Sequence, residues 1–105
     1  MTIDKTKAKE ILVNELNYKD FEADSILEEV SKISNVFAPV MQKWLDDRSV
    51  SDFLIEGISI KDVMNSHNCD VVRAAIEMNF LLDPNITPEN KQIIIRNLKE
   101  DHIFV

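Results

Sequence analysis

The fold is decided by residues 71–82, which read VVRAAIEMNFLL. At about 100° per residue on a helical wheel, they form two apolar arcs and one narrow polar strip, made of Arg73 and Glu77. A helix that is apolar on almost every side is buried in the centre of its domain or shared with another chain. The stretch therefore predicts an all-α protein with a nearly all-apolar central helix.

The second apolar arc of this helix holds Val72, Ile76 and Phe80. If the other helices leave the arc uncovered, it forms an exposed apolar stripe, which is a mark of protein interfaces. Two alternatives stay open with equal weight. Either a monomer buries the stripe, or a homodimer or heterocomplex uses it.

Residues 59–82 resemble a helix-turn-helix corner. Ser59 is placed to cap a short helix, a turn follows at His67-Asn68-Cys69, and Asp70 is placed to cap the long apolar helix. Such corners read DNA with the start of their second helix. Here that start offers one base, Arg73, against two acids, so DNA contact by Arg73 is kept only as the alternative function.

Apolar periodicity and capping residues outline the rest of the chain. The expected architecture is a compact bundle of five to six short helices, in a single domain over residues 1–105. The helices are expected over residues 4–16, 21–34, 35–47, 60–66, 71–82 and 88–100. We place a break near Ser34-Asn35, because Pro39 would kink a continuous helix.

Residues 48–58 lack helical periodicity, yet they contain Phe53, Leu54 and Ile55. These three side chains either pack under the bundle, as a loop or a short extended segment, or face a partner, and we favour packing. The only glycine is Gly57, and such scarcity argues against β-hairpins and phosphate-cradling loops. The apolar C-terminal residues 103–105 are expected to dock on the protein or to remain an adhesive tail.

Charge limits the class of partner. The formal net charge is −7, and most of the excess lies in residues 21–57, which disfavours nucleic acid because phosphate contacts need Lys and Arg. No stretch has the roughly 18 apolar residues of a membrane span. The single cysteine, Cys69, and an N-terminus without a secretory pattern suggest a cytoplasmic protein.

The sequence offers little chemistry. His67, Cys69 and Asp70 lie close together, but structural zinc needs four ligands and only His102 remains, so we expect no metal and no cofactor. The position of Cys69 near a helix N-terminus could lower the pKa of its thiol. Without a base beside a nucleophile, we expect no enzyme.

By elimination, the expected function is non-enzymatic: a small acidic regulator, inhibitor or accessory factor that binds a protein of unknown identity, a second copy of itself, or both. The candidate interface residues are Phe53, Leu54, Ile55, Val72, Ile76 and Phe80. A third class of function is a small-molecule pocket lined by Asn79. Instead of a pocket-lining role, we favour for Asn79 a buried side-chain amide that is hydrogen-bonded to the backbone.

Overall fold

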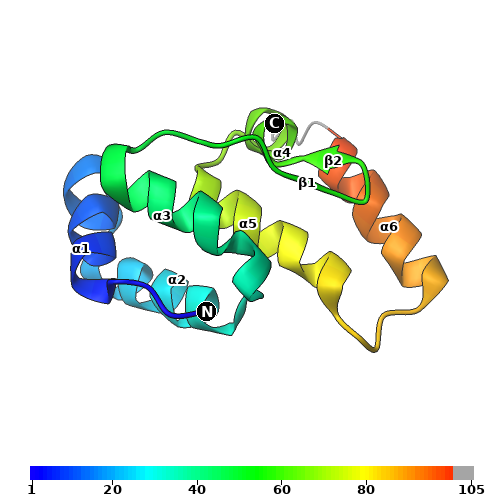
Figure 1. Ribbon diagram of the computed structural model, residues 1–105, viewed down its shortest axis with the longest axis horizontal. Helices are drawn as coiled ribbons and strands as arrows, with labels where there is room; N and C mark the ends of the chain where they lie inside the picture. The colour runs from blue at the N-terminus through cyan, green and yellow to red at the C-terminus, as the bar shows by residue number, and fades with distance from the viewer. Residues whose placement is uncertain (101–105) are drawn as a thin grey trace. The chain divides into compact units, whose positions relative to one another are not determined.

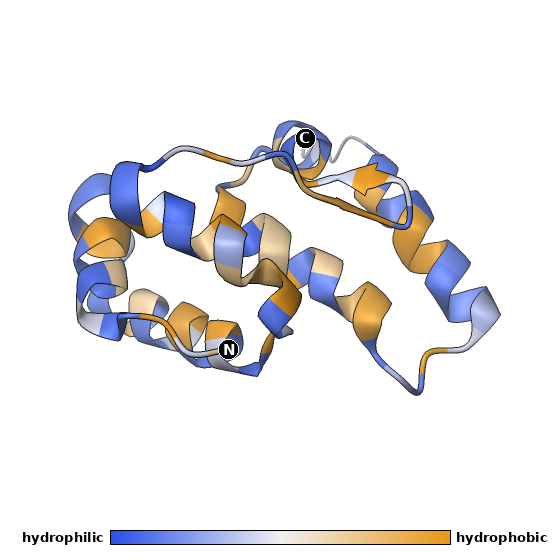
Figure 2. Cartoon of the chain, viewed as in Figure 1, coloured by the Kyte–Doolittle hydropathy of each residue, from blue (hydrophilic) through white to orange (hydrophobic). Residues whose placement is uncertain are grey.

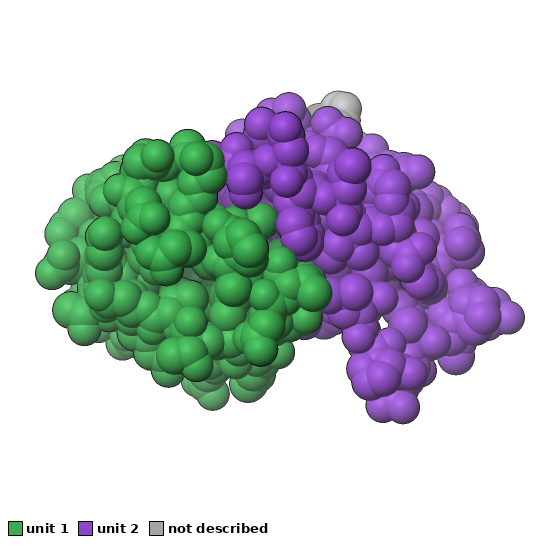
Figure 3. All heavy atoms as spheres, in the orientation of Figure 1, with its two compact units in different colours: residues 1–49 green, residues 50–105 purple. Residues whose placement is uncertain are grey.

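The computed structural model of the protein describes residues 1–100. Within that range it contains six α-helices and one hairpin of two short strands, so the predicted all-α fold with five to six helices is confirmed (Figure 1). The chain divides into two compact units, Met1–Ser49 (unit 1) and Val50–Val105 (unit 2) (Figure 3). The single domain over residues 1–105 stays a prediction, and the apolar residues 103–105 lie outside the described range.

Unit 1 begins with a helix that widens toward its end. The side chain of Asp4 accepts a hydrogen bond from the Lys7 backbone N–H and caps α1, Lys5–Glu10. A wider π-helical turn, η1, follows over Ile11–Glu15. The turn closes with a 3.1 Å bond from the Leu16 N–H to the Ile11 carbonyl, and positive φ at Asn17 ends the helix.

The second helix, α2, runs over Asp20–Lys32 and buries Ala23, Ile26, Leu27 and Val30. This is the inward face that the sequence predicts, and Figure 2 shows the division into apolar and polar faces along the helices. At its start the Glu22 carboxylate accepts a 3.2 Å bond from the Lys19 N–H, which satisfies a free backbone donor.

The expected break between the second and third helices is confirmed. Ile33 is extended, a 3₁₀ turn, η2, covers Asn35–Phe37, and α3 covers Ala38–Asp47. The cap is Ser34 rather than Asn35, since the Ser34 hydroxyl accepts the Val36 N–H. Pro39 lies in the first turn of α3, where helical N–H groups have no intrahelical partner to lose.

Unit 2 opens with an antiparallel hairpin, which the scarcity of glycine had argued against. Strands β1, Leu54–Ile55, and β2, Ile58–Ser59, pair Leu54 with Ser59 and Ile55 with Ile58. Both turn residues have positive φ, 53° at Glu56 and 75° at Gly57. A two-residue turn of this hand matches the twist of paired strands, so one glycine in the right place is enough.

Three helices complete the described part of unit 2. They are α4, Ile60–His67, α5, Val71–Asn79, continued by the 3₁₀ turn η3, Phe80–Leu82, and α6, Pro88–Lys99. The predicted helix-turn-helix corner is present, with left-handed Asn68 ending α4. The caps predicted at Ser59 and Asp70 are formed, and the Thr87 hydroxyl caps α6.

Most of the apolar helix is hidden. On the first arc, five side chains are at most 3% exposed: Val71, Ala74, Ala75, Met78 and Leu81. The chain itself therefore covers this arc except at its last residue, Leu82, which is 37% exposed. In the polar strip formed by Arg73 and Glu77, the Glu77 carboxylate contacts the His67 ring.

Candidate interaction surface

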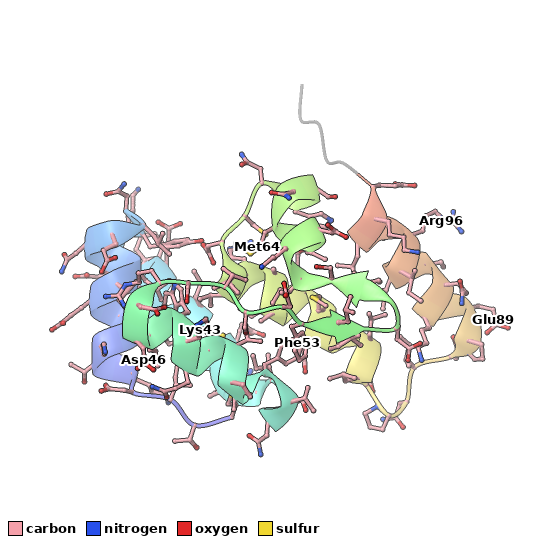
Figure 4. All side chains as sticks on the ribbon, turned by 45° about the horizontal axis from the view of Figure 1, so that its top comes forward. Lys43, Asp46, Phe53, Met64, Glu89 and Arg96 are labelled. Carbon is pink, nitrogen blue, oxygen red and sulfur yellow. The ribbon has the colours of Figure 1, made fainter. Side chains whose placement is uncertain are left out.

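The segment Phe53–Ile55 combines both readings of the sequence. Successive side chains on a strand point to opposite sides. Phe53 and Ile55 are accordingly half-buried, while Leu54 between them is 66% exposed. The segment is thus the short extended piece considered above (Figure 4, where Phe53 is labelled). It presents one large apolar side chain, that of Leu54, to solvent.

The stripe of Val72, Ile76 and Phe80 is not continuous on the surface. Val72 is fully buried, Ile76 is half-buried and Phe80 is 59% exposed. The physical reason lies at the two ends of the helix. A turn of three residues brings the start of α5 against α4, whereas at the other end the chain tightens into η3 and leaves Phe80 at the surface. Val72 therefore belongs to the interior, and Phe80 remains as the exposed member of the stripe.

Two further apolar side chains lie in elements that contact each other. Leu82 in η3 is 37% exposed and Ile93 in α6 is 48% exposed. Helix α6 contacts both η3 and β2. We group Leu54, Phe80, Leu82 and Ile93, which are the large apolar side chains exposed in the described part of unit 2, under the name apolar surface of unit 2. Sequence reasoning missed Ile93, although the run Ile93–Ile95 gave a signal, since three consecutive helical residues cannot all face one core.

Two ion pairs connect the hairpin segment to helices of unit 2. Lys91 Nζ of α6 lies 2.7 Å from Glu56 Oε1 in the hairpin turn. Lys61 Nζ of α4 lies 2.8 Å from Asp52 Oδ1, just before β1, and its hydrogen bond lowers the pKa of the Asp52 carboxyl. Both pairs join the hairpin segment, which carries Leu54, to a helix.

His67 joins three helices of unit 2. Its Nδ1 lies 2.7 Å from Oε2 of Glu77 in α5, and its Nε2 lies 2.9 Å from the carbonyl oxygen of Asn97 in α6. A carbonyl only accepts, so Nε2 is the donor there, and Nδ1 then faces a carboxylate oxygen that is buried from solvent. The sequence placed His67 in a turn and gave no signal for Glu77 or Asn97, because packing brings them together.

No group of three His, Cys, Asp or Glu side chains able to hold a metal ion occurs in residues 1–100. Cys69 departs from expectation. Burial, and then the charges of Glu77 and Asp70, raise the pKa of its thiol to about 11 instead of lowering it.

The corner offers little positive charge for DNA. Arg73 is exposed near the start of α5, as expected. The neighbouring Asp70 caps that helix through a 3.0 Å bond from the Arg73 N–H. Unit 2 carries nine acidic residues against five basic ones. Two of the basic residues, Lys61 and Lys91, are already paired with carboxylates.

Two hollows in the described residues bear on the predicted pocket at Asn79. One of about 330 Å³ lies between the hairpin, α4 and α6, and its polar side chains include Ser59, Asp62 and Lys99. A larger groove of about 670 Å³ lies in unit 1. Asn79 lines neither of these two and is half-buried on α5.

No helix within residues 1–100 combines the length and the apolar character that crossing a membrane requires. Comparison of the chain with known protein families, with curated proteins and with solved structures gives no match. The candidate site is therefore defined by the geometry of the chain itself: apolar side chains presented on elements that are fastened to helices.

Proposed function

We propose that the chain works by binding a protein, either another chain or a second copy of itself, through the apolar surface of unit 2. The observation that carries the proposal is the exposure of Phe80, 59%, and Leu54, 66%. Single exposed apolar residues are common on any protein. These two differ because η3, which carries Phe80, contacts α6 directly, and β1, which carries Leu54, pairs with β2, which contacts α6, so binding would need little reordering.

The residue types support the same proposal. Aromatic side chains are enriched at protein interfaces and supply much of their binding energy, because they bury a large area at a small cost in conformational entropy. Phe80 is such a side chain and Leu54 adds a branched aliphatic one. Acidic residues such as Glu89, which projects from α6 in Figure 4, would form a polar rim that keeps the free chain dispersed.

The test is a double substitution with a matched control. Leu54→Asp with Phe80→Asp places two charges on the proposed surface, and Asn90→Asp with Gln92→Glu adds the same charge at exposed polar positions of α6. We expect the first variant to lose self-association in light scattering, and to lose partners that co-purify with the wild-type chain. The control should keep both. Equal behaviour of the two variants would contradict the proposal.

DNA binding by the corner of α4 and α5 is the alternative function. It is favoured only by the formation of the corner itself, with Arg73 exposed on its second helix. A gel shift at low salt separates the two functions, because DNA contacts of this kind weaken as salt is added. Salt-sensitive binding that Arg73→Glu abolishes would replace the protein-binding proposal.

A further inference from the structure

Helices α1 and α2 lie side by side in unit 1 (Figure 1). Their side chains line an open groove of about 670 Å³. Val13 and Leu27 supply apolar lining, and Leu27 is only 7% exposed. The remaining lining is polar or charged, and α2 contributes the larger share of the negative charge. The groove is thus an amphipathic channel on the surface of one unit.

The wall contributed by α2 carries a line of carboxylates. Asp20, Asp24 and Glu28 follow one another at every fourth position and all line the groove. Residues four apart on a helix lie on one side of it and about 6 Å apart along its axis. All three are exposed, and within residues 1–100 no ion pair joins Asp20 or Glu28 to a cation.

The opposite wall, from α1, neutralises only part of this charge. Lys9 Nζ reaches across the groove to Asp24 Oδ1 at 3.0 Å, and that hydrogen bond raises the pKa of the Lys9 ammonium. Lys5 also lines the groove, but so does Glu10. The lining therefore holds four acidic side chains against two basic ones.

An exposed aromatic residue stands beside the acidic line. Phe21 is 68% exposed, more than any other large apolar side chain in residues 1–100. On a helical wheel of about 100° per residue, Phe21 falls roughly 20° from Glu28. Leu27 falls roughly 60° from Asp24, on the opposite side of Asp24 from Phe21. The acidic line thus has an apolar side chain on each side. The Lys19 ammonium, 6.0 Å from the ring centroid, leaves most of Phe21 uncovered.

We propose that this groove, with Phe21 at its edge, binds a basic amphipathic segment of another protein. Lysine or arginine side chains spaced one helical turn apart would meet Asp20 and Glu28, and compete with Lys9 for Asp24. Apolar side chains between them would cover Phe21 and Leu27. Charge complementarity selects this occupant, because nucleic acid and anionic lipid would both be repelled by the same carboxylates.

The test uses a defined probe, a fluorescently labelled helical peptide of about 18 residues made of Leu and Lys, with Lys at every fourth position along one face. Fluorescence anisotropy measures its Kd for the full chain at low and at raised salt. Asp20→Asn, Asp24→Asn and Glu28→Gln together should weaken binding roughly ten-fold, since exposed charge pairs each contribute modestly. Added salt should weaken binding to the wild type more than to this variant.

The matched control changes the overall charge equally but leaves the groove intact. It combines Glu29→Gln, Asp46→Asn and Glu100→Gln at exposed positions, of which Asp46 is labelled in Figure 4. We expect its Kd to stay within about two-fold of wild type, since long-range charge is screened. An equal loss in both triple variants would overturn the proposal, because the peptide would then respond to net charge alone.

Phe21→Ser gives a second readout, since the ring is 68% exposed and its removal leaves the core untouched. It should weaken peptide binding several-fold at either salt concentration, and no change would contradict the role of the groove edge. None of these substitutions touches the apolar surface of unit 2. If the groove does not bind the peptide, the proposed function of the apolar surface is therefore still tested separately, by the variant that combines Leu54→Asp with Phe80→Asp.

Discussion

Val72 and Phe80 belong to one apolar arc of the sequence, and the structure predicts opposite responses to the same substitution. Val72 is 0% exposed. In Val72→Asp a carboxylate would lie in the interior with no partner, at a cost of about 3–5 kcal/mol, and the burial of the valine, worth about 2 kcal/mol, would be lost. The sum of about 5–7 kcal/mol is comparable to the whole stability of a small protein.

Phe80→Asp should be much milder. Because the ring is already 59% exposed, only the remainder of a side chain of roughly 200 Å² leaves its contacts. At about 25 cal/mol per Å² this amounts to at most about 2 kcal/mol, and the new carboxylate stays hydrated.

Urea unfolding followed by far-UV circular dichroism tests this pair. We expect Phe80→Asp to remain folded with a modestly lower midpoint, and Val72→Asp to be largely unfolded without urea. A folded Val72→Asp variant with a midpoint near that of wild type would refute the assignment of Val72 to the interior. An unfolded Phe80→Asp variant would refute the exposure of Phe80.

Three further predictions follow from the side-chain contacts. With the pKa of its thiol raised to about 11, Cys69 should react with iodoacetamide near pH 8 roughly two orders of magnitude more slowly than in urea-unfolded chain, and react faster as pH rises. The bidentate bonds from Arg48 lower the pKa of the Glu15 carboxyl, so an NMR titration of Arg48→Gln should show the Glu15 midpoint moving up. As the pH falls through the lowered pKa of Glu15, the wild type should lose more stability than this variant. His67→Phe should cost about 1–3 kcal/mol in thermal unfolding by leaving the Glu77 oxygen buried and unpaired, and Glu77→Leu in the same chain should recover part of the loss.

Local signals allowed most of the secondary structure to be predicted. The caps at Ser59 and Asp70 form as expected, because a cap involves residues two or three positions apart and needs no knowledge of the rest of the fold. The break before Asn35 was predictable from a local signal too, because Pro39 restricts where a helix can begin.

The candidate site was less predictable. Counting glycines could not reveal that Gly57 lies in the turn, where both residues have positive φ, so the hairpin that turns Leu54 outward was missed. The wheel treated Val72 and Phe80 alike, because a wheel carries no information on which neighbours cover each end of a helix. The contact of His67 with Glu77 depends on the packing of α4 against α5, which the spacing of the two residues does not encode.

The central claim is that Phe80 contacts a protein partner, and site-specific photo-crosslinking tests it most directly. A photoreactive phenylalanine analogue placed at position 80 differs little from the native side chain. The same analogue at Gln92, an exposed polar position, serves as control. The account predicts that position 80 forms a covalent adduct with a protein, either a second copy or another chain, and that position 92 does not. Absence of an adduct at position 80, or equal adducts at both positions, would contradict it.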